Sequence, residues 1–336
     1  MKKITNKDIA ELAGVSPAAV SKAMNGRVGI SDETRKKVLA IAREYNYITN
    51  STSVDLVNRP AHYIAVLCEN NDILGDEIHY SEMIYNAMKA TTGTKYSIIP
   101  VFFEVEDGLL KLPEIMSSGG IDGAFILGDQ NPIIYAELNK LGVPFVVLDS
   151  HENSVACVSM NYKKATYDAI KYLIDLGHKD IAIISNGELH ELNVYIIGGF
   201  QNAMKEAGIA VLPNRMQINA NSEESMEKCI EKALDGPKTP TAIFCAIDAY
   251  SINVIGYLNK KGIRVPEDIS VMSIGDYQLS KNMIPAITTM CIDKHRIIVE
   301  GLEMLESLMQ GKKVKSKFLG LELIARDSTA PPRKTK

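Results

Sequence analysis

Seven side chains among the first 25 residues have the chemistry needed to read a DNA groove. Hydroxyl, amide and ammonium groups exchange hydrogen bonds with phosphates and base edges, and small apolar side chains contact the thymine methyl group. These groups act together only if one element carries most of them on an outward face. The residues are Thr5, Ser16, Pro17, Ala18, Ser21, Lys22 and Asn25.

Two short helices joined by a glycine are predicted at this position. Thr5, followed three residues later by Asp8, forms a capping box that starts a first helix. Apolar residues then recur at helical spacing, and Gly14 ends the helix because glycine accepts left-handed backbone angles. The predicted packing face of this helix comprises Ile9, Leu12 and Ala13.

A second helix is predicted directly after this turn. Ser16 supplies its N-cap, and Pro17 occupies the first helical position, where a missing N–H costs nothing. Val20 and Ala23 face the core, which leaves Lys22 and the first helical turn facing outward. Helix, glycine turn and helix form the layout in which the second helix enters the major groove.

A third helix is predicted to complete an all-α headpiece over residues 1–49. Ser31 is its N-cap, and Asp32 and Glu33 stand in its first turn, where acidic side chains complement the positive end of the helix. The predicted packing residues of this helix are Val38, Leu39, Ile41 and Ala42.

The charge of the chain is distributed unevenly. The net charge of −4 for the whole chain argues by itself against a nucleic-acid partner. Residues 1–59, however, carry ten Lys and Arg against six Asp and Glu, a net of +4, while the remaining residues carry 27 against 35, a net of −8. A basic head on an acidic body is typical of a DNA-binding module joined to a sensor domain.

The segment DIAELAGVSPAAVSKAMNG resembles the headpiece of the LacI/GalR family of transcription regulators. The resemblance covers Asp8 to Asn25, with Ala19 in place of the usual threonine and Lys22 in place of the usual arginine. It implies a sequence-specific regulator, most often a repressor, that binds a near-palindromic double-stranded operator as a homodimer. It also implies that a small-molecule effector controls DNA binding.

Residues 50–60, NSTSVDLVNRP, are polar and lack a helical apolar stripe, so their composition predicts a hinge linker. In the resembled family this stretch contacts the operator, and its leucine wedges into the minor groove, a position held here by Leu56. Paired apolar wedges kink DNA by unstacking a base step. The resemblance also assigns DNA contacts to Asn50 and Ser53, whereas Asp55 brings an anion near the phosphates.

After the linker, β-rich apolar runs alternate with helical patterns. One series begins at YIAVLCE and a second at DIAIIS, and NAMK occurs on the first long helix of each. This repetition predicts an α/β core of two lobes with parallel sheets and a ligand cleft at the carboxyl ends of the strands. The segments VPFVVLD and GIRVPEDISVMSI resemble the same family, whose cores are similar to periplasmic sugar-binding proteins.

The resemblance implies that three crossovers join the two lobes. The tail, residues 331–336, lacks a leucine heptad, so a zipper-tailed tetramer is not expected. Within the effector-binding and dimerisation core, residues 61–330, the expected lobes are about 61–160 with 291–319 and about 161–290 with 320–330.

The effector site is predicted from side chains near strand ends and helix starts. Ile196 stands where the family commonly has an arginine that grips a sugar or carboxylate, while several carboxylates remain. Because desolvated carboxylates repel an anion, a sugar or another neutral or cationic metabolite is favoured. The alternative is that several of these groups only satisfy buried backbone amides. The predicted residues are Glu69, Asn161, Tyr195, Ile196, Asp248 and Asp276.

Several enzyme classes are excluded by the motifs that the sequence lacks. It contains no GxGxxG or phosphate loop, no HExxH and no GxSxG, so no enzymatic activity and no cofactor are expected. Its five cysteines form no CxxC pair and are expected to be reduced core thiols, with no metal site. No apolar stretch has membrane-spanning length and no signal peptide is evident, so a cytoplasmic protein without membrane contact is expected.

Pairing and regulation each leave two alternatives. The segment Ile298–Met309 has an apolar helical face that could contact a second copy, although the core of one chain is the favoured place for it. The core could respond to a partner protein rather than a metabolite, as some family members respond to a phosphorylated carrier. DNA binding that changes with small molecules would favour the metabolite, and a change only with a second protein would favour the partner.

Overall fold

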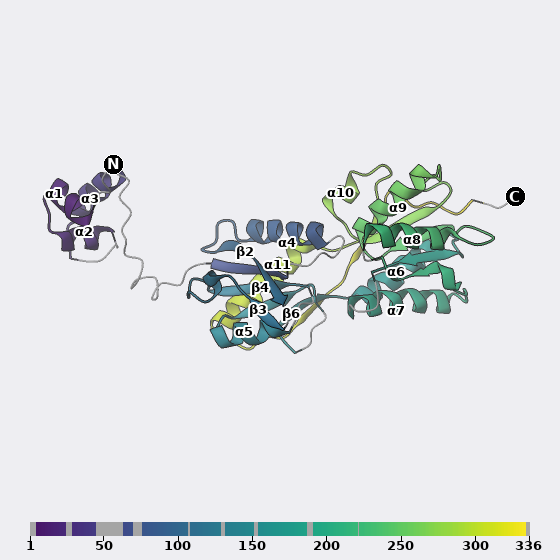
Figure 1. Cartoon of the computed structure of the whole chain (residues 1–336), viewed down its shortest axis with the longest axis horizontal. Coiled ribbons are helices and arrows are strands. Elements are labelled where there is room, and N and C mark those ends of the chain that lie inside the picture. Colours follow the sequence, from purple (N-terminus) through teal and green to yellow (C-terminus); the bar gives the residue numbers. More distant parts are fainter. Residues whose placement is uncertain are drawn as a thin grey trace. The chain divides into compact units, whose positions relative to one another are not determined.

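The chain forms two compact units in the computed structural model, Met1–Ala61 and His62–Lys336 (Figure 1). Among the described residues, no helix is both long enough and apolar enough to cross a membrane. The residues that the structure describes are 5–24, 29–44, 63–69, 76–106, 108–128, 132–150, 154–186, 191–220 and 222–333.

The first unit contains the three predicted helices of the headpiece. Thr5 N–H donates to Asp8 Oδ2 at 2.6 Å, and Asp8 N–H donates to Thr5 Oγ1 at 3.4 Å, which confirms the capping box. Gly14 ends the first helix with a φ of 66°. The helices are α1 (Asn6–Ala13), α2 (Pro17–Met24) and α3 (Asp32–Glu44).

Hydroxyl caps also start the other two helices of the headpiece. Ser16 Oγ accepts from Ala19 N–H at 3.2 Å, and Ser31 Oγ accepts from Thr34 N–H at 3.1 Å. Both caps were predicted, and both satisfy amides that the first helical turn leaves without a partner.

The headpiece core is built from small and β-branched side chains, and Leu12 differs from the prediction. The side chain of Leu39, another predicted packing residue, lies outside the described part of the chain. Leu12 is 47% exposed, so its assignment to the packing face of α1 is wrong. Ala10, which is 3% exposed, faces the core instead, because the second and third helices cover the side of α1 that carries it. The buried residues of this core are Ile9, Ala10, Ala13, Val20, Ala23 and Val38.

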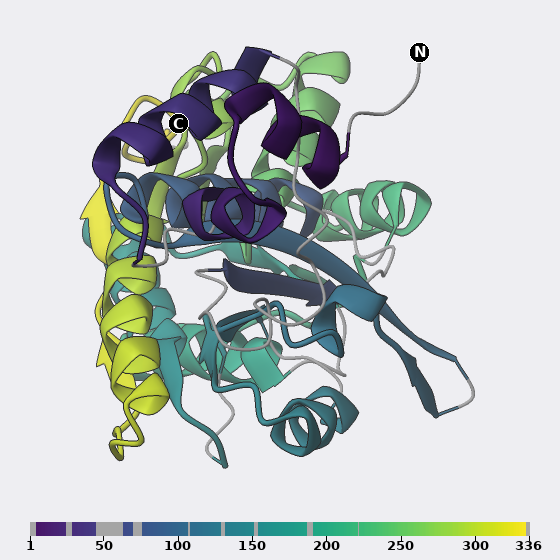
Figure 2. The same cartoon turned by 90° about the vertical axis from the view of Figure 1, so that its left-hand side faces the viewer.

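The second unit contains two sheets, one in each lobe. The first has seven strands in the order β12-β6-β5-β4-β1-β2-β3, and its pairs are parallel except for the hairpin β2–β3, which projects from the sheet edge (Figure 2). Parallel strands are buried on both faces, which explains continuous apolar runs such as YIAVLCE. The strands are β1 (Tyr63–Glu69), β2 (Ser97–Glu106), β3 (Leu109–Lys111), β4 (Gly123–Leu127), β5 (Phe145–Leu148), β6 (Cys157–Met160) and β12 (Lys317–Leu319).

The second sheet has six strands in the order β13-β11-β10-β9-β7-β8. Its pairs are parallel except for β11–β13, so the last strand returns along the sheet edge in the opposite direction. The strands are β7 (Ile181–Ile184), β8 (Met216–Gln217), β9 (Ala242–Cys245), β10 (Ser270–Gly275), β11 (Thr288–Cys291) and β13 (Glu322–Ile324).

Helices cover both faces of each sheet (Figure 1). In the first lobe α4 packs with α11 and α5 lies on the other face; in the second lobe α6 packs with α7, opposite α8 and α9. This arrangement confirms the predicted fold class. The helices are α4 (Asp76–Ala90), α5 (Ile133–Leu141), α6 (Tyr162–Asp175), α7 (Glu191–Glu206), α8 (Glu223–Leu234), α9 (Asp248–Lys260), α10 (Gln278–Lys281) and α11 (Lys294–Met309).

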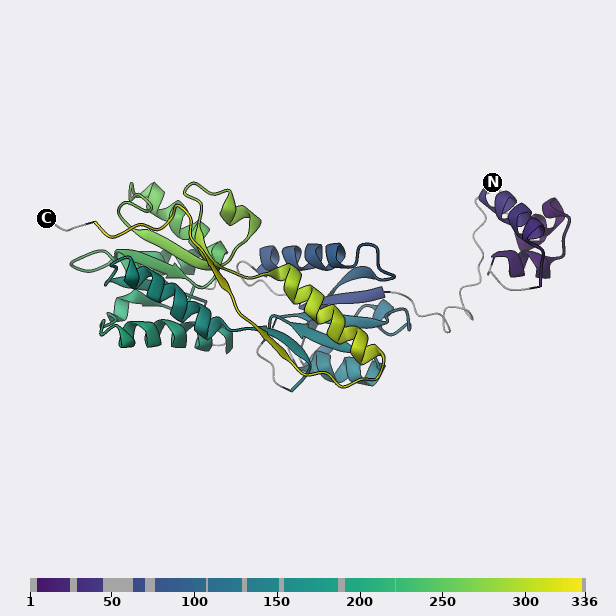
Figure 3. The same cartoon turned by 180° about the vertical axis from the view of Figure 1, so that it is seen from behind.

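The chain passes between the lobes at three points. The first-lobe strand β6 is followed by α6 of the second lobe, and the second-lobe strand β11 is followed by α11 of the first lobe. The third passage separates β12 from β13, which belong to different sheets although only Gly320 and Leu321 lie between them. Figure 3 shows α11 on the first lobe and the segment after it returning to the second.

Helix α11 belongs to the core of one chain, which was the favoured of the two alternatives for this segment. Ile298 and Leu305 are fully buried against the first-lobe sheet. Gly301 lies so close to that sheet that a Cβ atom at this position would stand 2.6 Å from Leu148 Cδ2. The buried face of α11 is therefore already covered by its own lobe.

Candidate nucleic-acid interface and effector cleft

The first two turns of α2 present an exposed face. Pro17, Ala18 and Lys22 are exposed, and Ser21 beside them is partly exposed. The first turn of α2 contains no acidic residue. The positive end of the helix dipole is therefore uncompensated within the helix and favours a phosphate, and the Lys22 ammonium adds a charged donor to the same face.

Thr5 and Ser16 are exposed, but both hydroxyls already cap helices. Thr5 Oγ1 donates to Asp8 Oδ2 at 2.6 Å, and Ser16 Oγ accepts from Ala19 N–H. Both residues fix where a helix begins, so a DNA contact from either would be an additional role. The remaining predicted DNA contacts lie outside the described residues and stay predictions: Asn25, Asn50, Ser53 and Leu56.

Asp248, at the start of α9, is fully buried and bonded to its own lobe. Its Oδ1 accepts from Ser273 Oγ at 2.5 Å and from Thr289 Oγ1 at 2.9 Å, and its Oδ2 accepts from Tyr277 N–H at 2.8 Å. The carboxylate thus ties α9 to β10, to β11 and to the segment after β10. These bonds support the alternative in which the carboxylate satisfies buried groups of the fold.

Asp276 follows β10, and cations of the same chain neutralise it. Arg326 Nη2 lies 2.5 Å from Asp276 Oδ1, and Lys281 Nζ lies 3.1 Å from Oδ2. Burial alone would raise the pKa of this carboxyl, but Arg326 and Lys281 outweigh it and hold the pKa below its usual value. A carboxylate with two cationic partners has little free charge to offer a ligand.

The other four predicted effector residues differ in exposure. Asn161 is exposed and caps α6, where its Oδ1 accepts from Lys164 N–H at 3.0 Å. Glu69 at the end of β1 and Tyr195 on α7 are partly exposed, whereas Ile196 is 1% exposed and lies in the hydrophobic core. Ile196 therefore offers a ligand no polar group and almost no surface. Contacts between a ligand and these residues stay predictions.

A polar cluster at the end of β5 joins three side chains that were not predicted as a site. His79 Nε2 on α4 lies 3.3 Å from Asp149 Oδ2, and the Tyr162 hydroxyl donates to Asp149 Oδ1 at 2.6 Å. Burial, together with the nearby Lys294 ammonium, lowers the pKa of His79 from 6.5 to about 3. The imidazole is thus neutral at pH 7, and its contact with Asp149 is a hydrogen bond rather than an ion pair.

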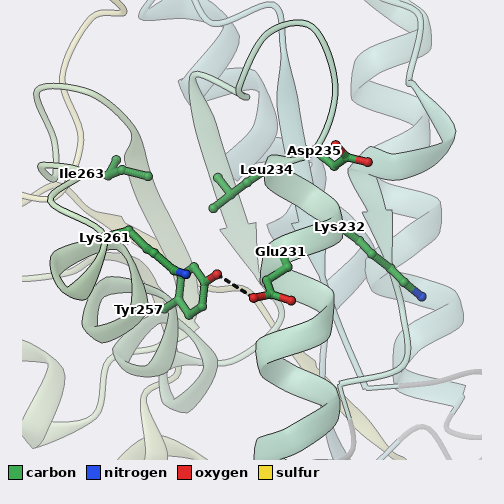
Figure 4. Close-up of a pocket in the computed structure, with 7 residues that line it drawn as sticks. All are labelled: Glu231, Lys232, Leu234, Asp235, Tyr257, Lys261 and Ile263. Atoms are coloured by element: carbon green, nitrogen blue, oxygen red, sulfur yellow. Dashed lines mark hydrogen bonds between the residues drawn. The ribbon is translucent and has the colours of Figure 1, made fainter.

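The hollows that described residues line on the second unit include two of several hundred Å³. The larger, of about 680 Å³, is lined from both lobes, with Glu82 and Lys294 among its residues. The smaller, of about 540 Å³, lies between α8 and α9, where the Tyr257 hydroxyl donates to Glu231 Oε1 at 3.1 Å (Figure 4). Of the predicted effector residues, Asp276 lines the larger hollow and none lines the smaller.

Comparison with known families matches both units of the chain. The profile of bacterial regulatory proteins, lacI family, matches residues 5–50, and that of the periplasmic binding protein-like domain matches residues 170–329. The headpiece and the two-lobed core thus occur in the order of one known architecture. The chain belongs to the lacI family of bacterial regulatory proteins.

Relatives match this lacI-family chain over nearly its whole length. It is 29% identical over 323 residues to catabolite control protein A of Priestia megaterium, covering 95% of this chain and 96% of the relative. It is 28% identical over 337 residues to the HTH-type transcriptional repressor PurR of Histophilus somni (strain 129Pt), covering 96% and 98%. The Lac repressor dimer bound to operator and the anti-inducer ONPF has a TM-score of 0.77 at 24% identity, covering 98% and 100%, which shows the same fold.

The cluster around Asp149, which the sequence did not predict as a site, has a counterpart in the other lobe of the lacI-family core. Asp149 after β5 and Asp276 after β10 both adopt left-handed backbone angles, with φ of 58° and 60°. Such conformations in non-glycine residues are strained and concentrate at functional positions. The available signal was the repeat of an apolar strand followed by aspartate, in VPFVVLD and ISVMSIGD. Only Asp276 was selected from it.

Proposed function

We propose that this lacI-family chain is a transcriptional repressor that binds a near-palindromic operator and responds to a small molecule held between its lobes. Helix α2 carries this proposal, because its start is capped, its first turn contains no acidic residue, and Pro17, Ala18 and Lys22 are exposed on it. In this role the chain catalyses no reaction, needs no cofactor, and acts in the cytoplasm, where operator DNA is accessible.

Selection of bound sequences from random duplex DNA tests the proposal. We expect the enriched sequences to contain two inverted half-sites, because a single recognition helix reads too few base pairs for a unique site. Selection is repeated at low and physiological salt, since phosphate contacts alone weaken steeply as salt rises. A pool without enrichment at either salt concentration would contradict the proposal.

We further propose that the chain pairs through the edge formed by α4 and the segment around α10. These elements are neighbours, because Gln278 N–H of α10 donates to Glu82 Oε1 of α4 at 2.8 Å. Large apolar side chains on α4, on α10 and just after α10 are exposed, as is typical of interaction surfaces. They are Tyr85 (65% exposed), Met88 (55%), Leu279 (51%) and Ile284 (89%).

Sedimentation equilibrium tests this pairing surface. The wild-type chain is expected to be a dimer, and Met88→Glu is expected to shift it toward monomer, because a charge would be buried at the interface. Val194→Glu, on an exposed position of α7, is the matched control and should leave the dimer intact. A dimer unaffected by Met88→Glu would remove the α4 surface from the proposal.

We propose a neutral or cationic metabolite, such as a sugar, as the effector. The support is that Ile196 supplies no cation and that Glu69, Asn161 and Tyr195 keep polar groups that are exposed or partly exposed. A thermal-shift screen tests the proposal: neutral or cationic compounds should raise the melting temperature, and stabilisation by sugar phosphates or nucleotides alone would contradict it. If no metabolite stabilises the chain and only an added protein changes DNA binding, the alternative of a partner protein holds.

A further inference from the structure

The two lobes contact each other through a buried lysine. Lys294, the first residue of α11, is 5% exposed, and its Nζ lies 3.0 Å from Glu82 Oε2 on α4. The same Nζ donates to the carbonyl oxygen of Gly275 at 3.0 Å and lies 4.7 Å from the centroid of the Tyr277 ring. Glu82 belongs to the first lobe, whereas Gly275 and Tyr277 belong to the second.

The carboxylate of Glu82 spans the lobes as well. While its Oε2 faces Lys294, its Oε1 accepts from Gln278 N–H at 2.8 Å. Glu82 and Lys294 together are called the lobe latch below. The latch holds three groups within four consecutive residues of the second lobe, at the end of β10: a carbonyl, an aromatic ring and an amide.

Because the Lys294 ammonium is buried, its contacts with the two lobes are either all made or all lost. A buried ammonium is tolerated only while its partners compensate the loss of water, so removing partners costs more than the pair gains. If the lobes rotate, Gly275 and Tyr277 move away from Lys294 together. The latch is therefore either made or broken, and interfaces of this kind switch between discrete arrangements.

A second buried ion pair shows what is particular to the latch. Arg215 is 2% exposed, and its Nε and Nη2 bond to Asp180 at 2.6 and 3.0 Å. Arg215 also donates to backbone carbonyls such as that of Ala233, at 2.6 Å. All of these groups lie in the second lobe, so this pair stabilises one lobe and does not join two.

We propose that the lobe latch holds the two lobes in the arrangement of this structure. The latch thereby sets how strongly a bound molecule must favour a different arrangement before DNA binding changes. The effect on DNA binding, which is the regulatory part, rests on the proposed function. The effect on the arrangement of the lobes, which is the mechanical part, does not. Glu82 and Lys294 are named positioning residues, because their contacts in this structure are with each other and with the second lobe.

The mechanical part is tested by the distance between the lobes in the full-length chain. Spin labels are placed on unnatural amino acids at Lys140 of α5 and Lys228 of α8, both exposed and in different lobes, and labelled chains are diluted with unlabelled chains. Electron–electron resonance should give one main distance for the wild type. Lys294→Met and Glu82→Gln, which keep side-chain size, should each add a second distance or broaden the first.

Asp180→Asn is the matched control, since it weakens a buried pair inside one lobe. It should lower thermal stability and leave the distance distribution unchanged. Distributions of the two latch variants that coincide with that of the wild type would overturn the proposal. Glu82→Gln keeps the test valid if Lys294→Met does not fold, because Glu82 is less deeply buried than Lys294.

The regulatory part is tested on a DNA site selected by the wild-type chain. Each latch variant should change the affinity for this site by about 2- to 30-fold, the range found when residues that couple distant sites are altered. The Asp180→Asn control should leave the affinity within twofold. Unchanged affinity in both latch variants would overturn the regulatory role. If the wild type selects no site, the proposed function fails, and the label distances still decide the mechanical part.

Discussion

The α2 face and the predicted effector site use polar residues in opposite ways. On α2, Pro17, Ala18 and Lys22 are exposed, so an outside molecule can reach them. In the second lobe, the predicted effector residues Asp248 and Asp276 are buried and bound to groups of that lobe. The comparison teaches that residue type alone does not reveal a binding site, because burial and internal partners decide whether a polar group is available.

The largest expected effect tests the internal side of this comparison. Asp248→Ala removes the acceptor shared by Ser273, Tyr277 N–H and Thr289. Because each buried donor left unpaired costs roughly 1–3 kcal/mol, the free energy of unfolding of the core should fall by about 3 kcal/mol or more. Urea unfolding followed by circular dichroism measures this fall.

Asn161→Ala is the matched control for this substitution, since it removes an exposed helix cap of the same unit. Its expected cost is about 1 kcal/mol. If Asp248→Ala unfolds at the urea concentration of the wild type, Asp248 does not serve the fold in the way its hydrogen bonds indicate.

The next effect tests the outward side of the comparison. Lys22→Ala should weaken binding to the selected DNA site by about 1–3 kcal/mol and relax the preference for one base pair, if the ammonium contacts a guanine edge. Fluorescence anisotropy with the selected site and single-base variants measures both changes. An equal loss on all sequences would identify Lys22 as a phosphate contact only, and Lys36→Ala on α3 is the control cation.

A smaller effect concerns the neutral imidazole of His79. Below pH 6.5 the unfolded chain binds a proton that the folded chain does not, because burial and Lys294 lower the pKa of His79 to about 3. Stability should therefore fall as the pH drops, by about 1 kcal/mol between pH 6.5 and 5.5.

Urea unfolding of His79→Gln over this pH range checks the assignment. The variant should show a shallower pH dependence than the wild type. Part of the slope should remain, because burial also lowers the pKa of His178. A slope equal to that of the wild type would show that His79 is protonated in the folded chain, and the cluster around Asp149 would then be an ion pair.

The smallest effect separates capping from DNA contact at Ser16. Ser16→Ala should destabilise α2 by about 1 kcal/mol, whereas Ser16→Gly should cost only a few tenths, because glycine is a tolerated N-cap. Hydrogen exchange of the α2 amides measures this difference. If both variants lose the same DNA affinity while their α2 stabilities differ, the hydroxyl contacts DNA directly.

The headpiece could be predicted from the sequence because its signals are local. Each helix end is set by residues within three positions of it: α1 begins at the Thr5–Asp8 capping box and ends at Gly14, and α2 begins at the Ser16 cap. Leu12 was misassigned because the spacing of apolar residues fits more than one face of an eight-residue helix, and the other helices select the face.

The partners of the cleft residues could not be predicted, because they lie far away in the sequence. Asp248 accepts from residues 25 and 41 positions further on, and no local pattern links them. His79 and Asp149 are likewise brought together only when α4 approaches the residue that follows β5. The alternation of strands and helices predicted the two sheets. It carries no information on which polar side chains become buried when the sheets and helices pack.

The central claim is that two copies of α2 read DNA in successive major grooves, and dimethyl sulfate protection of a selected site tests it most directly. The reagent modifies guanine N7, which lies in the major groove. The account predicts two protected half-sites, related by twofold symmetry and about 10 base pairs apart or a multiple of that, with protection lost in Lys22→Ala. A single protected patch, or no major-groove protection at a site that the chain binds tightly, would contradict it.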